Sequence, residues 1–259
     1  MTTVLLVRHG LTAVTGKILL GWTPGVGLDE RGRGQADAVA RRLAAVPLAA
    51  VVSSPLDRCR ETAAAIAAHR PAGAAVPDVA VDERFGECRY GDWTGQELAV
   101  LAKDPLWALV QNQPSAVVFP GAEGEALRDT QARGVNAVRE WNDRLGPDAT
   151  WLLCSHGDVI RTVVADALGL HLDLYHRITI DPCSLTVIHY GERRPLVRRL
   201  NDVGGDVADL LPAKPAPADA APATDPTAPA GPTPGAADPG EVVGGGAGAW
   251  SPPASAGTD

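Results

Sequence analysis

The 259-residue sequence has few cysteines and no long run of apolar residues. It contains four cysteines, with no CxxC pair and no spacing typical of a zinc site: Cys59, Cys88, Cys154 and Cys183. We therefore expect reduced thiols, no bound metal and an intracellular protein. The apolar stretch at residues 4–7 is far too short for a signal peptide or a membrane span. We expect a cytoplasmic protein that has no membrane partner.

Basic residues are also scarce relative to acidic ones. The chain has 23 lysines and arginines against 31 aspartates and glutamates, which gives a formal net charge of −8. Domains that bind nucleic acid usually carry the opposite balance, so we expect no nucleic-acid partner.

The composition changes near the C-terminal end of the chain. The last 48 residues contain 11 of the 22 prolines, with runs of alanine and glycine and almost no large apolar side chain. Such a segment cannot bury enough surface to offset the entropy of ordering it. The sequence therefore predicts one folded domain at residues 1–205, long enough for a single core, and an acidic disordered tail at residues 206–259.

Within residues 1–205, short apolar runs alternate with segments of helical periodicity. The expected strands are residues 4–7, 51–53, 79–81, 150–154, 185–190 and 196–200. The expected helices are residues 29–45, 57–68, 125–145 and 159–168. This alternation predicts an α/β fold with three layers, α/β/α, around a mostly parallel central sheet.

Two of the expected strands end in a histidine followed by a glycine. One reads Arg8-His9-Gly10 and the other His156-Gly157, and ligands of open parallel sheets bind at these strand ends. A third strand leads to Ser54, an expected N-cap, and then to Arg58 in the first helical turn. Either histidine alone could be structural. Together these cationic groups predict a phosphoryl site, with the backbone N–H groups after Gly157 as further donors.

The motifs around these residues resemble those of the histidine phosphatase superfamily, which has the phosphoglycerate mutase-like fold. Residues 8–12 read Arg-His-Gly-x-Thr, residues 53–58 match the second arginine block, and residues 155–157 match the second histidine block. Glu87, with Gly91 four residues later, matches the acid block. The resemblance covers about residues 1–202.

The resemblance implies a role for each matching residue. It makes His9 the nucleophile that becomes phosphohistidine, and Glu87 the proton donor of a phosphoric monoester hydrolase that needs no cofactor. The phosphoryl oxygens would be held by Arg8, Arg58 and His156. Further substrate contacts would come from Thr12, Thr15, Gly157, Arg89 and Tyr90. Thr15 stands where the family commonly has asparagine.

Several acidic residues have more than one interpretation. Asp82 and Glu83 are rivals of Glu87 as proton donor, although pairing with a nearby arginine or capping a turn would also explain them. Glu123 either lies near the pocket, as in the family, or complements the dipole of the following helix. Asp158 is expected to be a helix N-cap that points away from the phosphoryl site.

The substrate is expected to be a small phosphorylated molecule with a neutral or apolar leaving group. Mutases of the family carry an arginine where Cys88 stands and an insertion that the 69 positions between Glu87 and His156 cannot hold. We expect a lid that is poor in cations and contains three aromatic side chains: Trp93, Trp107 and Phe119. Lys17, Arg89 and Lys103 are the nearest basic residues for a second anion. Water would be the acceptor.

Two alternatives stay open. Residues 23–26 and 28–32 resemble a subgroup of actinobacterial phosphomutases and phosphatases, which keeps a phosphomutase as the second hypothesis. A noncatalytic module that binds a phosphorylated ligand is the alternative from a different class. The sequence does not determine the oligomeric state.

Overall fold

The computed structural model describes residues 1–69 and 78–204, and its centre is a six-stranded sheet with the order β3-β2-β4-β1-β5-β6. The strands are β1 (Thr2–Arg8), β2 (Ala50–Ser53), β3 (Val79–Val81), β4 (Thr150–Ser155), β5 (Leu185–Tyr190) and β6 (Pro195–Asp202). The first four are mutually parallel, whereas β5 and β6 form an antiparallel hairpin beside β1. The expected mostly parallel sheet is confirmed.

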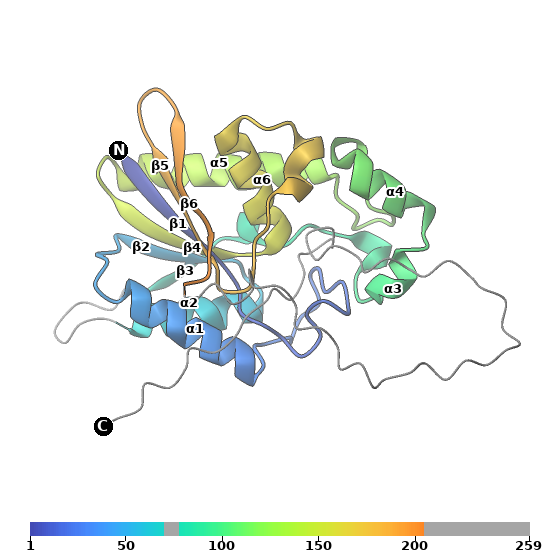
Figure 1. Cartoon of the computed structure of the whole chain (residues 1–259), viewed down its shortest axis with the longest axis horizontal. Coiled ribbons are helices and arrows are strands. Elements are labelled where there is room, and N and C mark those ends of the chain that lie inside the picture. The colour runs from blue at the N-terminus through green and yellow to red at the C-terminus, as the bar shows by residue number, and fades with distance from the viewer. Residues whose placement is uncertain (70–77, 205–259) are drawn as a thin grey trace, which may run out of the picture.

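Helices cover both faces of this sheet (Figure 1). One face carries α1 (Glu30–Leu43) and α2 (Asp57–Ala68), and the other carries α5 (Leu127–Leu145) and α6 (Gly157–Leu168). Along β1 the buried side chains alternate as the strand pleat requires: Leu5 and Val7 join the core against α1 and α2, whereas Val4 and Leu6 join the other core. The three-layer α/β/α architecture is confirmed.

The range predicted for α2, residues 57–68, is confirmed, whereas two predicted N-caps are wrong. Asp29 caps α1 by accepting a hydrogen bond from Gly32 N at 2.7 Å, as its position suggested. The predicted cap at Ser54 is wrong, because α2 begins at Asp57 and the Ser54 hydroxyl is bonded to the His156 ring. The cap assigned to Asp158 is also wrong: His156 occupies the N-cap and Asp158 is the second residue of α6.

The segment between β3 and α5 is built of short helical pieces that the sequence patterns did not reveal. They are η1 (Glu83–Phe85), η2 (Gly91–Trp93), α3 (Leu98–Leu101), α4 (Pro105–Asn112) and η3 (Pro114–Ala116), and η4 (Leu172–Arg177) follows α6. The expected aromatic lid is wrong, because Trp93 stacks on Trp107 at 6.0 Å between ring centroids and packs edge-on against Phe119 at 5.6 Å. Trp93 and Phe119 belong to the buried core.

No helix in the described ranges combines the length and apolar character that a membrane crossing requires. The four cysteines are buried as free thiols. The tail predicted for residues 206–259 lies outside the described residues.

Candidate active site

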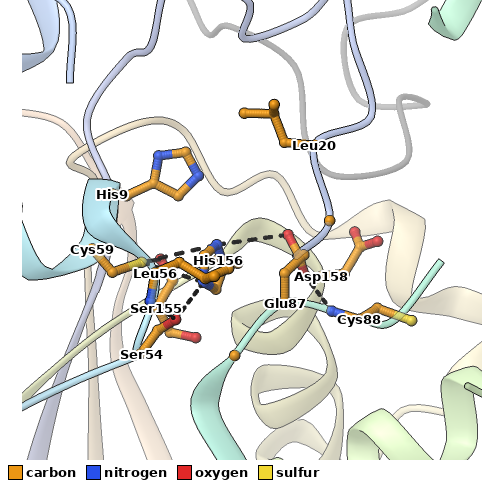
Figure 2. Close-up of polar contacts among 12 residues, drawn as sticks. His9, Leu20, Ser54, Leu56, Cys59, Glu87, Cys88, Ser155, His156 and Asp158 are labelled. Carbon is orange, nitrogen blue, oxygen red and sulfur yellow. Dashed lines mark hydrogen bonds and ion pairs between the residues drawn. The ribbon is translucent and has the colours of Figure 1, made fainter. Parts of the chain in front are cut away.

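Neighbouring strands bring the two histidines together, as their positions at strand ends predicted. Arg8 at the end of β1 is in register with Ser155 at the end of β4. The next residue, His9, donates its backbone N–H to Ser155 O at 3.0 Å. The His9 and His156 rings then lie edge to face with 5.3 Å between their centroids (Figure 2).

His9 is held in one tautomer by the backbone. Its Nδ1 lies 2.8 Å from Gly10 O, and because a carbonyl oxygen only accepts, Nδ1 carries the proton and Nε2 keeps a free lone pair. Burial, followed by the charges of Arg58 and Arg8, lowers the pKa of His9 well below its usual range. The ring is therefore a neutral nucleophile at neutral pH.

Hydrogen bonds hold the turn after β1 against α1 and α2. Gly10 N donates to Thr62 Oγ1 at 3.1 Å, and Leu11 N donates to Gln35 Oε1 at 2.9 Å. A Cβ on Gly10 would lie 2.6 Å from Gly32 O, closer than real Cβ atoms approach backbone. The glycine after His9 is thus required by the close approach of α1. The hydrogen bonds from Gly10 N and Leu11 N fix the Gly10 carbonyl that orients His9.

Two buried guanidinium groups stand beside the nucleophile. Arg8 donates through Nη1 to Ile180 O at 2.7 Å, and burial together with Arg161 lowers its pKa to about 10, which leaves it charged at neutral pH. Arg58 donates through Nη2 to Gly21 O at 2.8 Å. The Nε and Nη1 atoms of Arg58 are buried and have no hydrogen-bond partner among the described residues. Buried donors of this kind fit a phosphoryl group.

His156 is fully buried beside His9, and it is not among the residues that line the pocket. Its Nδ1 lies 3.3 Å from Arg58 Nη2, and since a guanidinium only donates, Nδ1 accepts and Nε2–H donates to Ser54 Oγ at 2.7 Å. Burial and Arg58 lower its pKa well below the usual range. The Cys59 thiol also packs within 3.4 Å of Nε2 (Figure 2). The contacts from Ser54 and Cys59 were not predicted.

Glu87 provides the acidic group of the site. Its Oε1 accepts the backbone N–H of Cys88 at 2.9 Å, and its Oε2 lies 4.0 Å from His156 Nδ1. Burial and the nearby Asp158 raise the pKa of Glu87 to about 8, although the Cys88 N–H, Arg58 and Arg8 act in the opposite direction. The carboxyl group is therefore protonated at neutral pH and can donate a proton.

The rival acids lie elsewhere. Asp82 accepts hydrogen bonds from Arg84 and from Trp141 Nε1, so it serves the packing of η1 against α5. Glu83 is exposed. Glu123 is exposed as well, 3.8 Å from Arg89. Within the described part of the chain, none of these three acids lines the pocket that holds His9.

That pocket has a polar floor and an apolar wall. Its floor consists of Arg8, His9, Arg58 and Glu87. The apolar wall, which we define as Ile18, Leu19, Leu20 and Leu98, was not predicted. The apolar run at residues 18–20, directly after the first histidine block, was the available signal. Backbone hydrogen bonds between residues 17–19 and 96–98 join the two parts of this wall.

The remaining predicted contacts divide into two groups. Thr15 and Tyr90 line the pocket, and Thr15 Oγ1 accepts the backbone N–H of Thr12 at 2.9 Å. Thr12, Gly157 and Arg89 do not line it. The Arg89 guanidinium lies instead over the Trp22 ring, 3.9 Å from its centroid. Lys17 and Lys103 are exposed and also absent from the pocket lining.

The relatives of the chain among known proteins include a bifunctional protein, a phosphatase and a probable mutase. The chain is 33% identical over 209 residues to a bifunctional protein of Mycobacterium tuberculosis, and it spans only about half of that protein, 54%, with 78% of its own length. It is 31% identical over 182 residues to phosphoserine phosphatase 1 of Hydrogenobacter thermophilus, which covers 67% of the chain and 80% of that enzyme. A probable phosphoglycerate mutase of Cronobacter sakazakii is 29% identical over 81% of the chain and 95% of the mutase.

A solved structure gives the same result for the fold. YhfR of Bacillus stearothermophilus superposes with a TM-score of 0.69 at 30% identity, over 79% of this chain and 98% of that one. The sequence profile of the histidine phosphatase superfamily (branch 1) matches residues 4–203. The chain therefore belongs to the histidine phosphatase superfamily, as its motifs indicated.

Proposed function

We propose that the protein hydrolyses small phosphomonoesters through a phosphohistidine formed on His9. The observation that carries this proposal is the fixed tautomer of His9, whose Nδ1–H is bound to Gly10 O while Nε2 stays free in a pocket with two guanidinium groups. A phosphatase among the relatives above 30% identity supports the same reaction class.

In the first step, His9 Nε2 attacks phosphorus in line with the leaving oxygen. The P–N bond forms as the P–O bond breaks, and the proton of the Glu87 carboxyl group passes to the leaving oxygen. Arg8 and Arg58 bind the other phosphoryl oxygens, where charge stabilisation and positioning supply most of the rate. His156, a neutral imidazole fixed by Ser54, packs beside His9 and Arg58.

In the second step, water replaces the departed alcohol. The Glu87 carboxylate takes a proton from this water as its oxygen attacks phosphorus, the P–N bond breaks, and inorganic phosphate leaves. His9 regains its lone pair and Glu87 regains its proton, so the site returns to its starting state.

The pocket favours a leaving group that is neutral and partly apolar. Arg8 and Arg58, the arginines in its lining, are engaged by the transferred phosphoryl group, and the apolar wall faces the remaining space. Burying apolar surface there contributes about 25 cal/mol per Å². A phosphomutase is the second candidate, and the mutase-like relative from Cronobacter sakazakii favours it.

The organisation of the chain is proposed with the function. We assign catalysis to residues 1–205 and no catalytic role to residues 206–259. The match of the superfamily profile to residues 4–203 supports this assignment.

The test is to trap the intermediate. Wild-type protein quenched during turnover of a ³²P-labelled monoester should carry acid-labile, base-stable label, whereas His9→Ala should carry none and lose nearly all activity. Chelators should leave the rate unchanged. A panel of esters then separates the two candidates: greater kcat/KM for an uncharged leaving group than for 3-phosphoglycerate supports the phosphatase, and interconversion of phosphoglycerates supports the mutase. A His9→Ala protein that retains most of its activity would refute both.

A further inference from the structure

Asp158 is a buried acid that the phosphoryl-transfer steps above do not use. It is fully buried as the second residue of α6, and Figure 2 shows its carboxylate beside Glu87. Burying a carboxylate that has no partner costs free energy. Its contacts therefore need an explanation.

Tyr90 and Arg161 hold this carboxylate in place. The Tyr90 hydroxyl donates to Oδ2 at 2.7 Å, and Arg161 Nη1 lies 3.5 Å from Oδ1. Arg161 is itself fixed, because its Nε donates to Ile178 O at 2.9 Å. Both partners are donors, so the two Asp158 oxygens act as acceptors and the carboxylate places negative charge next to the acid of the site.

We propose that Asp158 is a positioning residue for the reaction, and that its negative charge keeps the neighbouring Glu87 in the neutral acid form needed to protonate the leaving group. This inference rests on the proposed function. Tyr90 connects the substrate pocket to Asp158, since Tyr90 lines the pocket while its hydroxyl fixes the Asp158 carboxylate.

The balance of charge around Glu87 shows why a second acid is needed. The titratable and charged groups around Glu87 in the described ranges are Arg8 from β1 and His9 directly after it, Arg58 from α2, Arg133 from α5, His156 from the end of β4, Asp158 from α6, and Cys88 and Tyr90 from its own segment. Arg58 and Arg8 favour the ionised form of Glu87, and a carboxylate that had already lost its proton could not act as the acid. Burial and Asp158 oppose them.

The experiment compares Asp158→Asn with the wild type in the pH dependence of kcat/KM for an alkyl phosphate. The basic limb is the part of the profile in which kcat/KM falls as the pH rises. Removing the charge of Asp158 should move this limb to lower pH by about one unit, because Glu87 then ionises more readily. The ionisation of the substrate is the same for both proteins and cancels in the comparison. Asp166→Asn is the matched control: this acid lies on the same helix, pairs with Arg139 at the surface, and should leave the limb in place.

A second variant covers the possibility that Asp158→Asn does not fold. Tyr90→Phe removes a donor that favours the charged Asp158 carboxylate, so the basic limb should move down in this variant as well, by less than in Asp158→Asn. A basic limb that stays in place in the folded variants, or an Asp158→Asn protein that loses activity equally at every pH, would overturn the proposal.

A direct titration separates this inference from the proposed function. The ¹³C resonance of the Glu87 carboxyl group, identified by its absence in Glu87→Gln, should titrate at lower pH in Asp158→Asn than in the wild type. If no phosphate ester is turned over but the resonance shifts, the proposed function fails, whereas the effect of Asp158 on the ionisation of Glu87 stands. If esters are hydrolysed and neither the limb nor the resonance moves, Asp158 has no such role.

Discussion

The protonated state of Glu87 has a consequence for stability that can be measured without any substrate. The ordinary pKa of a glutamate is 4.5, and in the folded protein burial and Asp158 raise it to about 8. Between these values the folded protein holds a proton that the unfolded chain has released. Raising the pH therefore favours unfolding, and the stabilisation present below the lower value is lost as the pH rises through the upper one.

The Glu87→Gln substitution removes this proton but keeps the shape of the side chain. Each pH unit inside the window is worth about 1.4 kcal/mol, so between pH 5.5 and pH 7.5 the free energy of unfolding of the wild type should fall by about 2 to 3 kcal/mol relative to Glu87→Gln. Other titrating groups are common to both proteins and largely cancel in this comparison. We thus expect the free energy of unfolding of Glu87→Gln to increase relative to that of the wild type as the pH rises.

Urea unfolding of both proteins at the two pH values measures this difference. Glu83→Gln is the control, since Glu83 lies four residues earlier on the exposed surface and should show no such pH-dependent gain. If the difference between Glu87→Gln and the wild type is the same at pH 5.5 and pH 7.5, Glu87 is ionised in the folded protein. Its assignment as the proton donor would then lose its physical basis.

Three further predictions concern activity. Glu87→Gln should lower kcat by about 10²- to 10⁴-fold on an alkyl phosphate and far less on an aryl phosphate, whose leaving group needs little protonation; equal losses would make Glu87 a binding group. Leu20→Ala should lower kcat/KM for an ester with an apolar leaving group by about tenfold, through roughly 1 to 2 kcal/mol of lost burial, and should leave a methyl ester nearly unchanged. A chain that ends at Gly205 should keep the kcat/KM of the full chain, and a large loss would show that the removed residues act in catalysis.

The sequence predicted the parts of the site that depend on strand ends. His9, Arg8 and His156 follow apolar runs of a parallel sheet, and adjacency of β1 and β4 alone is enough to bring them together. The range predicted for the helix that carries Arg58 was right but its N-cap was wrong, since Ser54 binds a partner 102 positions away, and no local pattern can show such a contact.

Side-chain direction was the second thing the sequence did not determine. Trp93 and Phe119 lie in a segment of short helical pieces without a regular period, so nothing in their spacing showed that they face the core rather than the pocket. The same holds for Asp158: a residue at the start of a helix reads as a cap, and its burial against Tyr90 depends on a loop 68 positions earlier.

The apolar wall and the reacting groups come from different segments of the sequence. The reacting groups stand at strand ends that the central sheet fixes, whereas the wall comes from the loop at residues 18–20 and from Leu98, joined to each other by backbone hydrogen bonds. Substitutions there can alter which alcohol fits without displacing the nucleophile or its guanidinium partners. Such separation lets substrate preference change while the chemistry is kept, and it makes residues 18–20 and Leu98 the positions at which a library of variants could select a new preference.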